Sequence, residues 1–255
     1  MIPKIIHYCW LSNDPYPEDL VRCMNTWKEK LLDYEFKLWN FQNFDKSSSN
    51  WVSQAFDNKK YAFAADYIRL YAVYNYGGIY MDMDIEVLKS FDTLLDTNLL
   101  LAYENDEKNG IEAGCFGAEK NNPVIKECLD YYSGRNFIKE DGTFDILTLP
   151  KIMIQTTRKY PDLRIFDRYT FTCKSYQTGK IQTRNNSYAI HNFAGSWTSK
   201  AQQWYDKRRQ FYCQHFGNKI GKVFSMPSFI AWQVHDNGFK AFWKKVSNKI
   251  QGKKK

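Results

Sequence analysis

Residues 64–85 read AADYIRLYAVYNYGGIYMDMDI and contain the two patterns that decide the fold. The first is an apolar and aromatic segment, residues 61–76, which predicts a buried helix. Gly77 and Gly78 follow it and supply the backbone freedom that ends a helix. The second pattern is the short apolar run 79–81, which predicts a buried strand. A helix that leads directly into a buried strand is typical of an α/β sheet.

Asp82 and Asp84 follow the predicted strand, with one residue between them. Side chains on an extended segment alternate between two faces, so we expect both carboxylates to point the same way. Mg²⁺ and Mn²⁺ prefer oxygen ligands and commonly take one or two carboxylates together with substrate phosphates. The pair therefore predicts a divalent-cation site, with a solvated turn as the alternative.

Asp66 and Arg69 lie three residues apart in the predicted helix and therefore share one of its faces. Charged side chains inside so apolar a helix are costly unless they are paired or used. One interpretation is a salt bridge within the helix. The other is that both charges face a polar ligand held by Asp82 and Asp84.

The stretch 64–85 resembles the signature of sugar-nucleotide glycosyltransferases of the DXD type, specifically glycosyltransferase family 32. Two further segments resemble this family in the same order, IPKIIHYCW at residues 2–10 and AIHNFAGSW at residues 189–197. The family includes fungal initiating mannosyltransferases and bacterial capsule and lipopolysaccharide enzymes, and the large glucosylating toxins share its core. The resemblance implies a GT-A type, Rossmann-like α/β fold whose mostly parallel sheet is flanked by helices.

The resemblance also assigns roles around the two carboxylates. Asp66 and Arg69 match residues that contact the hydroxyls of the donor sugar and the phosphate. Asp82 matches the carboxylate that reaches the ribose and, through water, the metal. Asp84 matches the direct metal ligand. The four residues are therefore the expected catalytic group.

Five more residues match family positions, and three of them, His191, Trp10 and Trp197, also have a purely structural interpretation. His191 matches a member of the metal shell, although a histidine at a strand end is often a satisfied core or cap residue. Trp10 matches the aromatic residue that stacks on the donor base, or is a core aromatic. Ser196 and Trp197 match a flexible closure over the diphosphate, unless Trp197 only packs its loop. Glu112 lies where the family lines the acceptor side.

The resemblance implies a metal-dependent, retaining hexosyltransferase that uses Mn²⁺ or Mg²⁺ and a nucleotide-sugar donor. We expect a UDP-hexose, with UDP-galactose first, and keep a GDP-mannose-dependent mannosyltransferase as the alternative. The expected acceptor is a glycan or a polyprenyl-diphosphate-linked saccharide in bacterial surface polysaccharide synthesis. A haloacid-type phosphatase also uses D-x-D, but Ile85 and Glu86 do not continue its pattern. A non-catalytic sugar- or membrane-binding module would not explain why the polar residues named above occur together.

Length and charge divide the chain into a body and a tail. At 255 residues, we expect one glycosyltransferase domain over residues 1–238, including an amphipathic helix at 200–215, and a basic helical tail over residues 239–255. The tail contains seven lysines and no acidic residue, so only +1 of the net charge of +8 remains for the body. A nearly neutral body argues against a nucleic-acid surface.

The tail also has an apolar stripe with helical spacing, formed by Phe239, Phe242, Trp243, Val246 and Ile250. An aromatic stripe opposed by lysines is typical of a helix that lies on an anionic membrane surface. The alternative is a helix that packs its stripe on the domain.

The six cysteines form no C-x-x-C pair, and the first residues have no secretory pattern. We therefore expect free thiols and a cytoplasmic protein, peripheral on the inner face of the cytoplasmic membrane.

Overall fold

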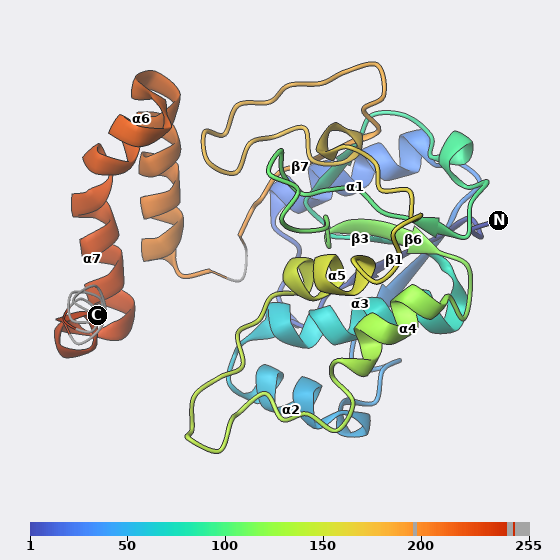
Figure 1. Ribbon diagram of the computed structural model, residues 1–255, viewed down its shortest axis with the longest axis horizontal. Coiled ribbons are helices and arrows are strands. Elements are labelled where there is room, and N and C mark those ends of the chain that lie inside the picture. Colours follow the sequence, from blue (N-terminus) through green and yellow to red (C-terminus); the bar gives the residue numbers. More distant parts are fainter. Residues whose placement is uncertain (196–197, 244–246, 248–255) are drawn as a thin grey trace. The chain divides into compact units, whose positions relative to one another are not determined.

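The computed structural model divides the chain into two compact units, and each is described by itself (Figure 1). The described residues are 1–195, 198–243 and 247. The first unit comprises residues 1–173 and 182–192, and the second comprises residues 174–181 and 193–255. None of the described helices is long and apolar enough to cross a membrane.

Within the described residues, a five-stranded sheet forms the centre of the first unit. Its strands lie in the order β2 (Glu35–Trp39), β1 (Ile5–Cys9), β3 (Gly78–Met81), β6 (Cys115–Ala118) and β5 (Leu99–Leu100). β1 pairs in parallel with β2 and β3, whereas β6 pairs antiparallel with β3 and β5. Four of these five strands therefore run in one direction, which confirms the predicted α/β fold with a mostly parallel sheet.

The central strand β3 is buried on both faces. Ile79 and Met81 pack in one apolar cluster, while Tyr80 packs in another, as the alternation of strand side chains requires. The first cluster includes residues of α1 (Glu18–Lys30), and the second includes residues of α3 (Tyr61–Tyr76). Helices therefore cover both faces of the sheet, as Figure 1 shows for α1 and α3.

The remaining helical segments of the first unit surround this core. They are α2 (Asn50–Asp57), α4 (Pro123–Asp130), α5 (Leu149–Thr157) and the short 3₁₀ helices η1 (Lys46–Ser48), η2 (Asp92–Leu94) and η3 (Arg168–Thr170). A separate two-stranded antiparallel sheet pairs β4 (Ile85–Val87) with β7 (Ala189–His191).

Two glycines form the turn from α3 into β3. Gly77 has φ +68° and Gly78 has φ +103°, a range that residues with a side chain rarely adopt. A Cβ on Gly78 would also lie 2.6 Å from the carbonyl oxygen of Ile5. The helix therefore ends at Tyr76 because only glycine can make this turn beside β1.

The second unit contains the helices α6 (Lys200–Phe224) and α7 (Met226–Asn237). The helix predicted at 200–215 continues to Phe224, with a break at Gly217, where φ is +76°. Tyr205 of α6 stacks on Trp232 of α7, with 5.2 Å between the ring centroids.

Along the chain, the second unit resumes at residue 193, and the single domain expected over residues 1–238 stays a prediction. Within the second unit, α6 and α7 pack on each other through aromatic side chains.

Candidate active site

Asp82 and Asp84 lie between β3 and β4, at the edge where the parallel strands β1 and β3 end. The backbone N–H of Asp82 donates to the carbonyl of Gly114 (2.7 Å), and its carbonyl accepts from the N–H of Ile85 (3.0 Å). The second of these bonds closes a turn. The segment is therefore not extended, whereas the sequence pattern predicted an extended one. The turn, and not strand alternation, brings the two carboxylates together.

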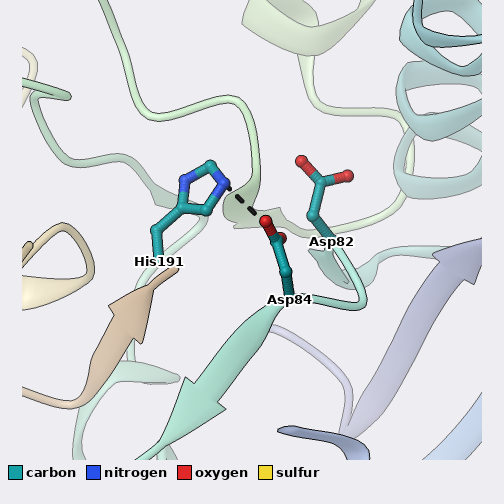
Figure 2. A group of neighbouring side chains, drawn as sticks. All are labelled: Asp82, Asp84 and His191. Carbon is teal, nitrogen blue, oxygen red and sulfur yellow. Dashed lines mark ion pairs between the residues drawn. The ribbon is translucent and has the colours of Figure 1, made fainter. Parts of the chain in front are cut away.

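His191 completes this group from the opposite strand of the small sheet. Residue 191 ends β7 and pairs directly with Ile85, the first residue of β4, so the pairing carries the imidazole to the aspartates. Its Nε2 lies 3.5 Å from Oδ1 of Asp84. Figure 2 shows the imidazole facing Asp84, with Asp82 beside them. One ligand atom from each of the three residues lies within 4.8 Å of the other two.

The three side chains fit a divalent cation of the Mn²⁺ or Mg²⁺ class. Two carboxylates and one imidazole are acceptable ligands for such an ion, and their number leaves positions for substrate oxygens. The side chain of Asp82 is 28% exposed, so the group opens toward solvent on that side. Asp82, Asp84 and His191 are the residues that would hold the ion, and their role as its ligands stays a prediction.

Glu112 explains the electrostatic state of His191. Both carboxylate oxygens of Glu112 lie 3.1 Å from Nδ1 of His191, which donates its hydrogen to them. Burial alone would lower the pKa of His191, but the negative charges of Glu112 and Asp84 outweigh it and raise this pKa to about 10. The imidazole therefore sits in a strongly negative environment, which is also one that attracts a cation.

The location of Glu112 differs from the expected one. The residue is only 2% exposed and its carboxylate contacts the imidazole of His191, so it cannot line a surface for an acceptor. The family resemblance at this stretch carried no information about burial, which tertiary packing decides.

Arg69 forms an ion pair within α3 and also contacts the candidate metal site. Its Nη2 lies 3.5 Å from Oδ1 of Asp66 within α3 and 3.3 Å from Oδ1 of Asp82. Its Nη1 also donates to the carbonyl of Ala113 (2.8 Å). The guanidinium is therefore fixed beside the metal-binding group, and the salt bridge within the helix is one of the contacts that fix it.

Asp66 and Tyr80 complete the surroundings of this arginine. Burial raises the pKa of Asp66 to about 6, although the Arg69 charge opposes this shift. The Tyr80 hydroxyl donates to Oδ1 of Asp82 (2.8 Å), and the tyrosine ring lies under the guanidinium, 4.6 Å from its centre. Sequence reasoning missed Tyr80, although its position two residues before Asp82 was a usable signal.

Trp10 follows β1 and is partly exposed at the same sheet edge. Its indole N–H donates to the carbonyl of Asp14 (3.0 Å), and its ring meets Tyr16 edge to face. These contacts hold the indole, and its stacking on a donor base stays a prediction. Ser196 and Trp197 lie outside the described residues.

Comparison with known proteins agrees with this geometry. Residues 17–101, which include α3, Asp82 and Asp84, match the family described as "glycosyltransferase sugar-binding region containing DXD motif". Over this third of its length, the chain is similar to that glycosyltransferase family.

Three known proteins illustrate what the chain is similar to. Inositol phosphoceramide mannosyltransferase 3 of Schizosaccharomyces pombe is 30% identical over 132 residues, which cover 50% of this chain and 36% of the relative. An uncharacterized glycosyltransferase of Acanthamoeba polyphaga mimivirus, L373, is 25% identical over 216 residues, which cover 77% of this chain and 84% of the relative. The solved structure of the PaToxG glycosyltransferase has a TM-score of 0.48 at 20% identity, and the match covers 63% of this chain and 70% of that one. The chain spans about a quarter to a half of the length of the fungal relatives that it matches.

Proposed function

We propose that this protein is a metal-dependent glycosyltransferase that moves a hexose from a nucleotide sugar to a glycan or lipid-linked acceptor. The observation that carries this proposal is the convergence of Asp82, Asp84 and His191 beside the fixed guanidinium of Arg69. A sugar- or membrane-binding module has no need for a buried arginine beside a cation site.

The chemistry follows from where charge develops. Cleavage of the glycosidic bond leaves negative charge on a diphosphate, and a cation held by the aspartates and His191 would neutralise part of it when bound. Arg69 places a second positive charge next to Asp82 before the reaction starts, so no reorganisation is needed. Retention of anomeric configuration, which the family resemblance implies, is part of the proposal.

Two donor classes compete. The resemblance to bacterial and toxin enzymes supports a UDP-hexose, with UDP-galactose first. The fungal relatives, whose names describe mannosyltransferases, support a GDP-mannose donor and a lipid acceptor. For a UDP-hexose donor, the matching proposal is that the enzyme acts in bacterial surface polysaccharide synthesis. Its acceptor would then be a polyprenyl-diphosphate-linked saccharide.

A donor panel tests the function. Nucleotide release is measured from UDP- and GDP-sugars with Mn²⁺, with and without simple sugar acceptors, for the parent protein and for Asp84→Asn. We expect one donor to be cleaved by the parent protein alone. Donor binding without any release, across the panel and with acceptors present, would favour the binding module instead.

We also propose that the second unit attaches the protein to an anionic membrane surface, on the cytoplasmic face. Phe239 and Trp243 are 62% and 51% exposed, at the start of the lysine-rich tail; Val246 and Ile250 of the predicted stripe lie outside the described residues. Further exposed apolar side chains on the two helices of this unit are Trp204, Phe211, Phe216, Ile220, Val223, Phe224, Met226 and Ile230. Basic side chains next to apolar ones suit an anionic lipid interface.

Vesicle binding tests this attachment with the full chain. Phe239→Ser combined with Trp243→Ser should weaken sedimentation with phosphatidylglycerol vesicles and leave nucleotide release in solution unchanged. Parent binding should weaken as salt rises, because surface charges are screened. Equal binding of parent and variant would contradict the role of the tail.

A further inference from the structure

The buried carboxylate of Glu112 lies on the far side of His191 from the aspartates. Nδ1 of the imidazole contacts Glu112 at 3.1 Å, while Nε2 lies 3.5 Å from Oδ1 of Asp84. The two ring nitrogens therefore have separate tasks, one toward the protein interior and one toward the candidate metal site. A carboxylate that accepts from Nδ1–H keeps the proton on that nitrogen, so a metal would bind at Nε2 in place of the proton there.

Glu112 is itself held on both oxygens. Oε1 accepts from the backbone N–H of Gly114 (2.7 Å), and Oε2 accepts from the hydroxyl of Thr172. The backbone N–H of His191 donates to the carbonyl of Phe171 (3.1 Å), so histidine and threonine belong to adjoining stretches of backbone. A buried charge with this many donors has a fixed position, and it fixes the ring that it contacts.

Gly114 shows how closely these groups are packed. A Cβ at this position would lie 2.8 Å from Oδ2 of Asp82, 2.9 Å from Oε1 of Glu112 and 2.9 Å from Cε1 of His191. The glycine is needed for space, since its φ is not positive. Glu112, His191 and Asp82 therefore all pack against the Cα of Gly114. This close packing holds the buried glutamate and Asp82 in one rigid arrangement.

We propose that Glu112 is the positioning residue of the metal site: it selects the Nδ1–H tautomer of His191 and aims Nε2 at the ion. This inference rests on the proposed metal-dependent function. Burying an ionised carboxylate is costly, and replacing it with an apolar side chain would be simpler if it served only the fold. A role in orienting a ligand explains why an ionised group stands there.

Mn²⁺ binding to the full-length protein, followed by electron paramagnetic resonance of the free ion, tests the proposal without any substrate. Glu112→Gln keeps the size of the side chain and should weaken Mn²⁺ binding by about 10- to 100-fold, the usual effect of losing a partner of a metal-bound histidine. Thr172→Val removes one hydrogen bond from Glu112 and should weaken binding by a smaller factor.

Glu104→Gln is the matched control. Glu104 is another partly buried carboxylate near Glu112 and His191, but its oxygen is hydrogen-bonded to Asn105 (3.1 Å). Removing its charge should change Mn²⁺ affinity less than Glu112→Gln does. An equal loss in both variants would mean that only negative charge matters, which would overturn the positioning role.

Nitrogen-15 spectra of the Mg²⁺-loaded protein supply a second readout that general destabilisation would not move. The chain has four histidines, so His191 can be assigned with His191→Gln. The parent should show one neutral tautomer, Nδ1–H, and Glu112→Gln a mixture. If Glu112→Gln does not fold, Thr172→Val carries both readouts.

Each outcome decides between the two proposals. Parent and Glu112→Gln proteins that bind Mn²⁺ equally would refute the positioning role and leave the metal site intact. A parent protein that binds no Mn²⁺ would refute the metal site, and the positioning role with it.

Discussion

Two histidines near opposite ends of β3, the buried His7 and the partly buried His191, differ in what surrounds them. At the start of the strand, His7 donates from Nε2–H to the carbonyl of Gly77 (2.7 Å) and accepts at Nδ1 from the indole of Trp39 (3.0 Å). Near its end, His191 faces Glu112 and Asp84. Burial lowers the pKa of His7 to about 4, whereas carboxylates raise that of His191 to about 10 despite its burial.

The difference teaches that burial alone does not distinguish a histidine with a structural role from one with a role in binding or catalysis. His7 has neutral partners and ties β1 to the glycine turn that starts β3. His191 has charged partners at both ring nitrogens, and titratable groups perturbed by charged partners are typical of functional sites. The region around His7 should therefore matter for stability and the region around His191 for chemistry.

The largest effect is expected at Asp84. Asp84→Asn keeps the shape of the side chain and removes the charge that would hold the cation, so kcat/KM for nucleotide release should fall by about 1,000-fold or more. Asp57→Asn is the control, since Asp57 is an exposed carboxylate that pairs with Lys46. Turnover near that of the parent protein in Asp84→Asn would remove the metal site from the account.

Arg69 should have the next largest effect. Because its guanidinium is fixed beside Asp82, Arg69→Lys should lower kcat by about 100-fold, with a smaller change in KM. The surface arginine of the Arg22–Glu86 pair offers the control variant Arg22→Lys. An unchanged kcat in folded Arg69→Lys would reduce Arg69 to a structural partner of Asp66 and Asp82.

Substituting the two histidines tests the comparison itself. His191→Gln should weaken Mn²⁺ binding by at least about 10-fold, with partial recovery of activity at high Mn²⁺, because one of several ligands is lost. His7→Gln should leave Mn²⁺ affinity unchanged and lower the free energy of unfolding. The comparison fails if the two variants exchange these effects, as measured by metal titration and urea denaturation.

Acid should reveal His7 through stability rather than activity. The unfolded chain binds a proton at His7 below about pH 6.5, whereas the folded protein does so only near pH 4. The contribution of neutral His7 to the free energy of unfolding is therefore fully present above pH 6.5. It is lost as the pH falls to 4, by about 3 kcal/mol. Urea denaturation across this range should show the loss in the parent protein and a smaller one in His7→Gln.

Local patterns predicted the parts of the structure that depend on neighbouring residues. The apolar helix, its glycine stop and the strand before Asp82 all follow from periodicity and backbone freedom within 64–85. The family resemblance added His191, which the pairing of β4 with β7 brings to the aspartates.

Tertiary packing decided the features that the sequence did not predict. Glu112 and His191 are 79 positions apart, and no periodic pattern links a loop carboxylate to a strand end. The turn at Asp82–Asp84 replaces the expected extended segment because β4 must leave the main sheet to pair with β7.

The central claim is that the end of β3 forms a donor site that works only with a divalent cation. Nucleotide release from the preferred donor, measured on chelator-treated protein during a Mn²⁺ titration, tests it most directly. The account predicts no release without metal, saturable recovery with Mn²⁺ in the parent protein and no recovery in Asp84→Asn. Release at the same rate before and after chelation would contradict it.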